Sequence, residues 1–210
     1  MKKDPYHRTA NWYDTLFQSV NAGLVAMSMK MFPPVPGTSV LDVGCGTGIQ
    51  LSHYQRAGCE ICGIDPSPAM LNVARKKLGC NAKLHLGDAA NMHFENDSFN
   101  LVTAMLVLHE MSPKNRDLVV AEIKRVTITN GRILIIDYHA GPLQPPKGWF
   151  SKAFITISEI GAGREHYQNY RDFMARKGVS SLVSNHGLII EQQRIVSGGN
   201  LGLFLLRTES

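Results

Sequence analysis

Residues 39–48 read SVLDVGCGTG, an apolar run that ends in an aspartate and then three glycines spaced two apart. Val40, Leu41 and Val43 suit a buried strand, and the glycines suit a sharp turn into a helix. Glycine adopts positive φ and lets a ligand approach the backbone without a Cβ in the way. The stretch therefore predicts a strand, a turn and a helix whose N–H groups attract a carboxylate or a phosphate.

The spacing of the glycines bears on which ligand fits. The dinucleotide fingerprint needs its third glycine at position 49, but that residue is Ile49 and the glycine comes one residue early, at Gly48. Asp42, just before the turn, suits an ammonium group better than a pyrophosphate, while the turn N–H groups take a carboxylate. An amino-acid end carries both charges. A structural turn, or a nucleotide site of another class, remains open at this point.

Length and composition set the class of protein. The chain has 210 residues, 44% of them hydrophobic, which is enough for one α/β domain and leaves little for a second. The formal charge is +5, but the basic residues are scattered and form no dense stripe, so we expect no nucleic-acid partner.

The apolar runs and the cysteines indicate where the protein is located and whether it binds a metal. We find no apolar run that would span a membrane and no signal-peptide core, and the four cysteines do not resemble a disulfide framework. We therefore expect a cytoplasmic protein. Cys59 and Cys62 have redox or metal spacing, but they fall in a predicted strand, where residues three apart point to opposite faces. We expect no metal site.

Strands and helices alternate along the middle of the chain, which predicts a parallel sheet. Strands are expected near residues 38–43, 59–64, 83–87, 98–105 and 131–137, the last after an Asn130-Gly131 turn. Helices are expected near residues 47–57, 67–78, 114–127 and 164–177. Residues 187–196 and 201–207 predict a closing hairpin, which adds one antiparallel strand to the sheet.

Two further acidic residues follow predicted strands. Asp65 comes 21 positions after Gly44, a distance at which a carboxylate reaches a ribose hydroxyl pair, although Asp65 or Ser67 could instead only cap a helix. Asp88 follows the third strand and can accept a hydrogen bond from an adenine amino group, with Met70 and Ala89 covering the ring. Asp42, Asp65 and Asp88 would thus bind the amino-acid, ribose and base portions of one ligand.

These stretches resemble the successive motifs of class I S-adenosylmethionine-dependent methyltransferases, in particular the ubiquinone/menaquinone-biosynthesis and related small-molecule or lipid group. The resemblance covers about residues 36–138. It implies a Rossmann-like, seven-stranded, mostly parallel sheet with an antiparallel C-terminal strand and helices on both faces. It also implies S-adenosylmethionine as the cofactor, bound by Tyr13, Asp42, Gly44, Cys45, Gly46, Gly48, Asp65, Pro66, Met70, Asp88, Ala89 and Leu106.

The segments outside this core are expected to choose and enclose the acceptor. We predict one domain over 1–210: a helical lid at 1–36, a cofactor-binding core at 37–138, a substrate-side insertion and helix at 139–185, and the closing hairpin at 186–210. The N-terminal helix could instead only pack on the core, or contact a membrane surface. Substrate-side residues are expected at Trp149, His166, Tyr167 and Tyr170.

Methyl transfer from a sulfonium is an in-line displacement that needs no metal, so the chain's main task is to position the acceptor. A carbon or oxygen acceptor also needs a base, for which His109 and His139 are the best-placed residues. Glu110, Asp137, Tyr138, His166 and Tyr167 are weaker alternatives. We predict methyl transfer to a small acceptor, with an apolar quinone, lipid or aromatic metabolite as the candidates. A nicotinamide-dependent oxidoreductase and a non-catalytic S-adenosylmethionine-binding module are the alternatives, and the oligomeric state is open.

Overall fold

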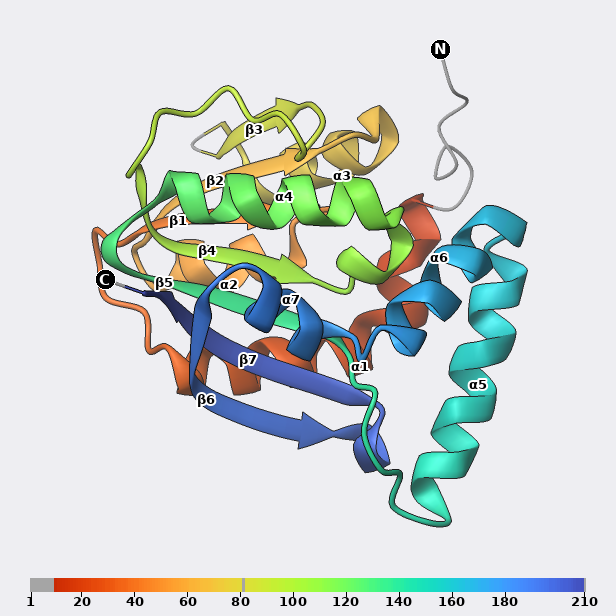
Figure 1. Ribbon diagram of the computed structural model, residues 1–210. Helices are drawn as coiled ribbons and strands as arrows, with labels where there is room; N and C mark the ends of the chain where they lie inside the picture. Colours follow the sequence, from red (N-terminus) through yellow and green to blue (C-terminus); the bar gives the residue numbers. More distant parts are fainter. Residues whose placement is uncertain (1–9, 81, 210) are drawn as a thin grey trace.

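The computed structural model describes the backbone of residues 10–80 and 82–209, and the side chains of residues 21–80 and 82–209. Its centre is a seven-stranded sheet in the order β3-β2-β1-β4-β5-β7-β6 (Figure 1). The strands are β1 (Ser39–Val43), β2 (Glu60–Asp65), β3 (Lys83–Leu86), β4 (Phe99–Met105), β5 (Thr127–Tyr138), β6 (Leu188–Val196) and β7 (Leu201–Thr208).

Strands β1 to β5 pair in parallel, and β7 pairs antiparallel with both β5 and β6. The last strand of the chain thus lies between β5 and β6. This confirms the predicted mostly parallel sheet with an antiparallel C-terminal strand.

Helices cover both faces of the sheet (Figure 1). The α-helices are α1 (Ala10–Met31), α2 (Ile49–Arg56), α3 (Pro68–Leu78), α4 (Pro113–Val126), α5 (Lys147–Gly161), α6 (Arg164–Ala175) and α7 (Val179–Asn185), with short 3₁₀ helices η1 (Leu108–Glu110) and η2 (Ser197–Gly199). On one face, α1, α2 and α3 bury Leu24, Leu51 and Leu71 against the sheet. On the other face, α4 and α7 bury residues such as Ile123 and Leu182.

Two helices that follow strands begin in the same way. Ser67 Oγ accepts a hydrogen bond from Met70 N (3.1 Å), and Ser112 Oγ accepts one from Asn115 N (3.4 Å). A proline comes directly after each serine, where its missing N–H costs nothing. These caps begin α3 and α4 close to the carboxyl ends of β2 and β4.

The structure differs from the sequence prediction in two places. The strand expected near residues 131–137 begins earlier, at Thr127, and extends to Tyr138. Its pairing with β4 jumps from Thr127, opposite Phe99, to Arg132, opposite Leu101, so residues 128–131 stand outside this ladder, with Asn130 at a φ of 68°. The apolar stretch after residue 149 is helical as part of α5, and α7 is an additional helix that the sequence pattern did not predict.

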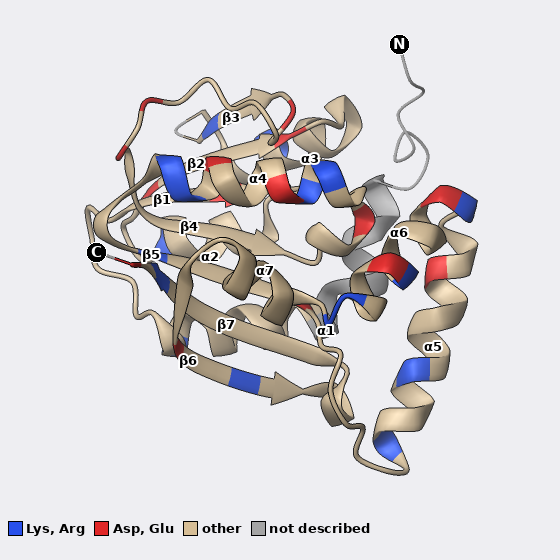
Figure 2. Cartoon of the chain, in the orientation of Figure 1, with Lys and Arg blue, Asp and Glu red and all other residues tan. Residues whose placement is uncertain are grey.

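Charged residues of both signs alternate along α4 and α6, whereas α5 is mostly uncharged (Figure 2). Within the described part of the chain, no helix combines the length and the apolar character needed to cross a bilayer.

Candidate functional site

The glycine turn opens onto a cavity of about 520 Å³ at the carboxyl ends of β1, β2 and β4. We call it the turn cavity. Parallel α/β sheets bind ligands at this edge, so the position matches the sequence prediction. The predicted binding residues that line it are Asp42, Gly44, Cys45, Gly46, Asp65, Pro66, Met70, Asp88, Ala89 and Leu106.

The turn itself is tied to β2 more tightly than the sequence suggested. The N–H groups of Gly44 and Cys45 both donate to Ile64 O, at 2.8 and 3.1 Å, and Gly46 N donates to Asp65 Oδ2 at 2.8 Å. The expectation of a row of bare N–H groups is therefore wrong for these three residues. The bonds hold the turn rigidly beside the cavity, and a ligand carboxylate must find its donors elsewhere.

The three glycines have different roles in this turn, although all have positive φ. A Cβ on Gly44 would lie 2.5 Å from Val107 Cγ2, whereas a Cβ on Gly46 would meet nothing within 4 Å. Gly48 is the left-handed N-cap of α2, and a Cβ there would lie 2.8 Å from Leu78 Cδ1. Gly48 does not line the turn cavity, and close packing against α3 accounts for this glycine.

Asp42 is buried on the floor of the turn cavity, at 3% exposure. Its Oδ1 accepts a hydrogen bond from Thr103 Oγ1 at 2.7 Å. Burial raises the pKa of Asp42 to about 7, with the Thr103 hydrogen bond opposing the rise and the nearby Asp65 charge adding to it. A cation placed in the cavity would reverse this effect by favouring the ionised carboxylate.

Asp65 and Asp88 lie further along the same cavity. Asp65 accepts from Gly46 N and, through Oδ1, from Ser67 N at 2.8 Å, while Ser67 Oγ provides the cap of α3. Asp65 also lines the turn cavity, with these backbone bonds fixing the orientation of its carboxylate. Asp88 is exposed, and its Oδ1 accepts from Ala90 N at 2.9 Å.

Two polar residues of the cavity wall were missed by the sequence analysis. Gln50 is 2% exposed, and neither its side-chain nitrogen nor its oxygen has a hydrogen-bond partner among the described residues. Asn21, on α1, is 4% exposed. Both line the turn cavity, and an unpartnered buried amide at such a wall is suited to a polar ligand group.

A second cavity of about 520 Å³ lies beside the first, under α5; we call it the α5 cavity. Asn21, Leu106 and Glu110 line both cavities, so the two spaces meet along these residues. The remaining wall is largely apolar and includes Phe150 and Phe154.

Leu106 stands at this boundary in a strained conformation. It follows β4 with φ of 54°, in the left-handed region that a branched side chain rarely adopts, and its N–H donates to Ile136 O at 2.7 Å. Such outliers cost about 1–3 kcal/mol and concentrate at functional sites.

Comparison with known proteins assigns the fold and the site to a family. The protein-family profile described as a methyltransferase domain matches residues 40–131, which include the glycine turn and the strands that line its cavity. The ubiquinone/menaquinone biosynthesis C-methyltransferase UbiE of Bordetella avium is 32% identical over 158 residues, covering 70% of this chain and 61% of that protein. A demethylmenaquinone methyltransferase of Beutenbergia cavernae is 27% identical and covers 82% of this chain and 74% of that protein.

The chain belongs to the class I S-adenosylmethionine-dependent methyltransferases.

Solved structures share the fold of this methyltransferase at low sequence identity. An S-adenosylmethionine-dependent methyltransferase from Mesorhizobium loti has a TM-score of 0.62 at 18% identity, covering 87% of this chain and 96% of that one. The PH0226 protein from Pyrococcus horikoshii has a TM-score of 0.68 at 18% identity, covering 98% and 96%. The chain spans about three fifths of the length of the Bordetella relative.

The turn cavity of this methyltransferase fits the cofactor, S-adenosylmethionine. Gly46 leaves open space where a Cβ would stand, and Asp42, Asp65 and Asp88 follow one another from the β1 end to the β3 end of the cavity. The order matches a cation, a ribose and a base in one extended ligand. Which side chain holds which portion stays a prediction, and the side chain of Tyr13 lies outside the described residues.

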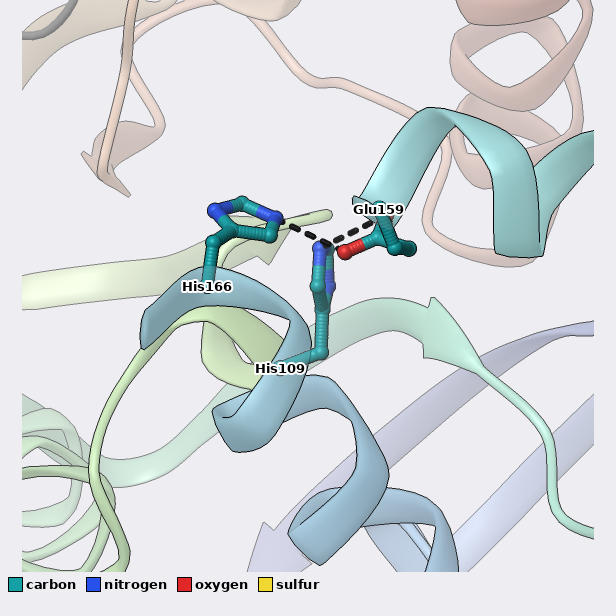
Figure 3. A group of neighbouring side chains, drawn as sticks. All are labelled: His109, Glu159 and His166. Atoms are coloured by element: carbon teal, nitrogen blue, oxygen red, sulfur yellow. Dashed lines mark ion pairs between the residues drawn. The ribbon is translucent and has the colours of Figure 1, made fainter. Parts of the chain in front are cut away.

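Of the two histidines predicted as bases, His109 is the one that lines a cavity. It is 3% exposed, lines the α5 cavity, and places Nδ1 2.7 Å from Asp137 Oδ1. Burial by itself would lower the pKa of His109, but the Asp137 charge and hydrogen bond outweigh it and raise the pKa to about 9. Glu159 and His166 also line this cavity close to His109 (Figure 3).

The other predicted acceptor-side residues are placed differently. His139 does not line either cavity, and its Nδ1 lies 3.0 Å from Gly199 O instead. Trp149 is 62% exposed on α5 and also lines neither cavity. Tyr170 is buried behind the cavity wall, with its ring 5.1 Å from that of Tyr138, and Tyr167 stacks on Tyr170. The structure brings His109 and His166 together and leaves these others apart.

Proposed function

We propose that this methyltransferase transfers the S-methyl group of S-adenosylmethionine to a small, largely apolar acceptor bound in the α5 cavity. The observation that carries the proposal is the contact between the two cavities along Asn21, Leu106 and Glu110. A cofactor in one cavity and an acceptor in the other would approach each other at that boundary.

The wall of the α5 cavity supports an acceptor with a substantial apolar part. Phe150, Phe154 and Ile155 contribute apolar surface from α5, and Leu201 contributes more from β7. Binding pockets of this size combine such surface with a few polar groups that orient the ligand. The names of the Bordetella and Beutenbergia relatives refer to quinone biosynthesis, which makes a quinone precursor the first acceptor to test, ahead of lipids and other aromatic metabolites.

When bound, S-adenosylmethionine supplies an electrophilic methyl group. The chain's own contribution would be to hold the two reactants in line and to exclude water, and such positioning is worth about 7–11 kcal/mol of a barrier. Leu106 lies at the boundary of the two cavities, and His109 lines the α5 cavity in which the acceptor would bind. Of the two predicted bases, His109 is therefore the better placed, and His139 is disfavoured by its place outside the cavity.

The test is a product assay with labelled cofactor. Purified protein would be incubated with methyl-labelled S-adenosylmethionine and, separately, a demethylated quinol, a monohydroxylated aromatic ring and a fatty acyl lipid. We expect label to enter at least one of these apolar acceptors, with release of S-adenosylhomocysteine. Cofactor binding without label in any acceptor would instead favour a non-catalytic module. Label entering only highly polar metabolites would overturn the assignment of the acceptor class.

Several other expectations remain proposals of the same kind. The division of the chain at residues 36, 138 and 185 follows the change from helical lid to core to acceptor side, and a cytoplasmic location is supported by the buried, free thiols of Cys45, Cys59 and Cys62. The absence of a nucleic-acid partner and a contact of the N-terminal helix with a membrane surface stay predictions.

A further inference from the structure

Three side chains from separate parts of the chain converge on one wall of the α5 cavity. His109 comes from η1, Glu159 from α5 and His166 from α6, and their ligating atoms all lie within 4.8 Å of one another (Figure 3). His109 Nε2 lies 3.7 Å from Glu159 Oε1, and His166 Nε2 lies 2.7 Å from Glu159 Oε2. An in-line displacement requires no such group of ligands, so the convergence needs its own explanation.

The orientation of His109 is set from behind the cluster. Asp137 is completely buried, and its Oδ2 accepts from the backbone N–H groups of Leu108 and His109, at 3.0 and 3.3 Å. Its Oδ1 is left facing His109 Nδ1 at 2.7 Å, which places the proton of the ring on Nδ1. His109 Nε2 therefore points towards Glu159 and His166, the side on which a bound metal ion would take the place of a proton. A carboxylate behind a histidine is the usual support of a metal-binding imidazole.

The donor set and its spacing match a particular class of ion. Two imidazole nitrogens and one carboxylate form the protein ligands of open, catalytic zinc sites. With metal–ligand bonds near 2.1 Å, ligand atoms at the corners of a tetrahedron are about 3.4 Å apart. The distance of 2.7 Å from His166 Nε2 runs to Glu159 Oε2, and the distance of 3.7 Å from His109 Nε2 runs to the other oxygen, Oε1. One ligand atom from each of the three residues lies within 4.8 Å of the other two, which is close enough for all three to reach one ion.

The burial of Glu159 also supports a site for a cation. Glu159 is 5% exposed, and Tyr138 donates a hydrogen bond to its Oε1 at 2.7 Å. Its Oε2 lies 2.7 Å from His166 Nε2, and no other described residue donates a hydrogen bond to this buried oxygen. A carboxylate oxygen in that position can still ligate a cation.

We propose that His109, Glu159 and His166 bind a divalent transition-metal ion, with zinc the best match, and that its open coordination position faces the α5 cavity. In this arrangement His109 acts as a ligand, and Asp137 is the positioning residue behind it. The nitrogen ligands disfavour magnesium and calcium, which prefer oxygen.

The metal site would also restrict which molecules can serve as the methyl acceptor. This consequence rests on the proposed function. A metal ion at the wall of the α5 cavity would bind an oxygen of the acceptor, which selects molecules that carry a hydroxyl or carbonyl group beside the methylated atom. Metal binding itself can be measured without an acceptor or cofactor, so its failure would be distinct from failure of the methyl-transfer proposal.

The experiment measures metal content directly. The full chain would be stripped with a chelator, loaded with zinc, cobalt or magnesium, dialysed against metal-free buffer and analysed by elemental mass spectrometry. We expect one zinc or one cobalt per chain, with a visible cobalt absorption band from nitrogen and oxygen ligands, and no retained magnesium. A wild-type chain that retains neither zinc nor cobalt would overturn the proposal.

Variants then locate the ion. His166→Ala and Glu159→Gln, the second of nearly unchanged shape, should lose the metal, and Asp137→Asn should weaken its binding about 10- to 100-fold. His186→Ala is the matched control, because His186 forms a histidine–carboxylate pair with Asp117 on another part of the molecule. S-adenosylhomocysteine binding checks that each variant is folded. Full metal content in both His166→Ala and Glu159→Gln, or its loss in His186→Ala, would contradict the assignment.

Discussion

Asp42 combines two properties that rarely occur together: it is buried, and it faces a cavity that receives a cationic ligand. Its raised pKa, about 7, means that much of the group is protonated near neutral pH in the ligand-free protein. A ligand amino group bound at Asp42, as predicted, would favour the ionised carboxylate, and binding below pH 7 would then release the Asp42 proton. Asp65, the charged neighbour that helps to raise this pKa, faces the same cavity.

The first prediction concerns how the affinity for S-adenosylhomocysteine depends on pH. Affinity for S-adenosylhomocysteine should increase about 20- to 30-fold between pH 5.5 and pH 7.5, because the cost of deprotonating Asp42 disappears as the pH passes 7. Isothermal titration in buffers of different ionisation enthalpy would measure both the affinity and the released proton. Asp42→Asn should bind weakly with a flat profile, while Asp88→Asn should bind weakly and keep the slope. A flat profile in the wild type would contradict this account of Asp42.

The second prediction concerns the glycine turn. Gly44→Ala should destabilise the fold by about 1–3 kcal/mol, because alanine disfavours a φ of 69° and its Cβ would overlap Val107. Thermal unfolding measures the effect, and cofactor binding should fall with it. Gly23→Ala is the control: Gly23 is exposed within α1 with open space around it, so alanine there should stabilise the helix by about 0.5–1 kcal/mol. Equal stability of Gly44→Ala and wild type would be inconsistent with this account of the turn.

Residues at strand ends were predictable, and residues on helices were not. Asp42, Asp65 and Asp88 stand out in the sequence because parallel strands place their carboxyl ends at one edge. No sequence pattern identifies Gln50 and Asn21 as site residues. A polar residue on a helix is usually solvated, and tertiary packing decides whether it is buried. His109 and His166 were each predicted as site residues, but Glu159 and the grouping of the three were missed: the residues lie on three elements, and only the fold brings them together.

Helix α5 forms one wall of the α5 cavity with an apolar surface that also faces solvent. Phe150 and Phe154 are 76% and 66% exposed and line the cavity, whereas Ile157, on the same helix, is 69% exposed and does not line it. Exposed apolar groups add little to the stability of the fold, so this helix offers a way to change acceptor binding alone.

The third prediction uses the difference between Phe154, which lines the α5 cavity, and Ile157, which does not. Phe154→Ala should raise KM for an apolar acceptor several-fold, since fully burying an aromatic side chain is worth about 1.5–3 kcal/mol and Phe154 is only partly covered. The dissociation constant of S-adenosylhomocysteine should not change, and Ile157→Ala should leave both constants unchanged. Steady-state kinetics and titration measure them. If Ile157→Ala raises KM as much as Phe154→Ala does, the acceptor does not bind where we place it.

Arg116 joins the elements that carry the acceptor-side residues. It is 2% exposed on α4, donates from Nε to Leu108 O at 2.9 Å and from Nη2 to Met111 O at 2.8 Å, and pairs with Asp172 on α6 at 3.2 Å. Its guanidinium also lies 4.8 Å from the centre of the Phe173 ring. The position of η1, and with it His109, depends on these contacts.

The fourth prediction is that Arg116→Met destabilises the fold by about 2–4 kcal/mol, because it removes the buried donor to the carbonyls of Leu108, Met111 and Asn169 and the partner of Asp172. Denaturant unfolding measures the change. Arg176→Met removes the exposed arginine that also pairs with Asp172, and its unfolding midpoint should match wild type. Similar midpoints for the two variants would show that Arg116 does not have this structural role.

Some helices and strands were predicted from the sequence and others were not, and the difference has a physical reason. The strands and the helices between them bury one face each, and burial produces the periodic pattern that the sequence shows. Helix α5 buries Gly148 and Glu159 and exposes most of its large apolar residues, so its pattern indicated an apolar stretch without indicating a helix. The Asn130-Gly131 pair signals a turn locally, and residues 128–131 do leave the ladder with β4, but β5 begins before them, at Thr127.

At the scale of the whole molecule, the cofactor should stabilise the fold by mass action. The fifth prediction is that S-adenosylhomocysteine at 100 times its dissociation constant adds about 2.7 kcal/mol and raises Tm by roughly 5–11 °C. Reduced nicotinamide dinucleotide at the same concentration should leave Tm unchanged. Differential scanning calorimetry compares the two, and a larger shift with the dinucleotide would contradict the cofactor assignment.

The architecture was predictable because alternating strands and helices leave few alternatives to a doubly covered parallel sheet. The hairpin at the end of the chain was also predicted, but which of its strands adjoins β5 was not evident from local pattern.

That placement affects the order in which the sheet can be completed during synthesis. Strand β6 leaves the ribosome before β7, yet it touches the rest of the sheet through β7 and must wait without a strand neighbour until residues 201–208 follow. The same delay leaves one edge of β5 open in the nascent chain. A released chain truncated after residue 196 would therefore expose the free edge of β5 and an unpaired β6, and chaperones that bind extended apolar segments should associate with it more strongly than with the full chain.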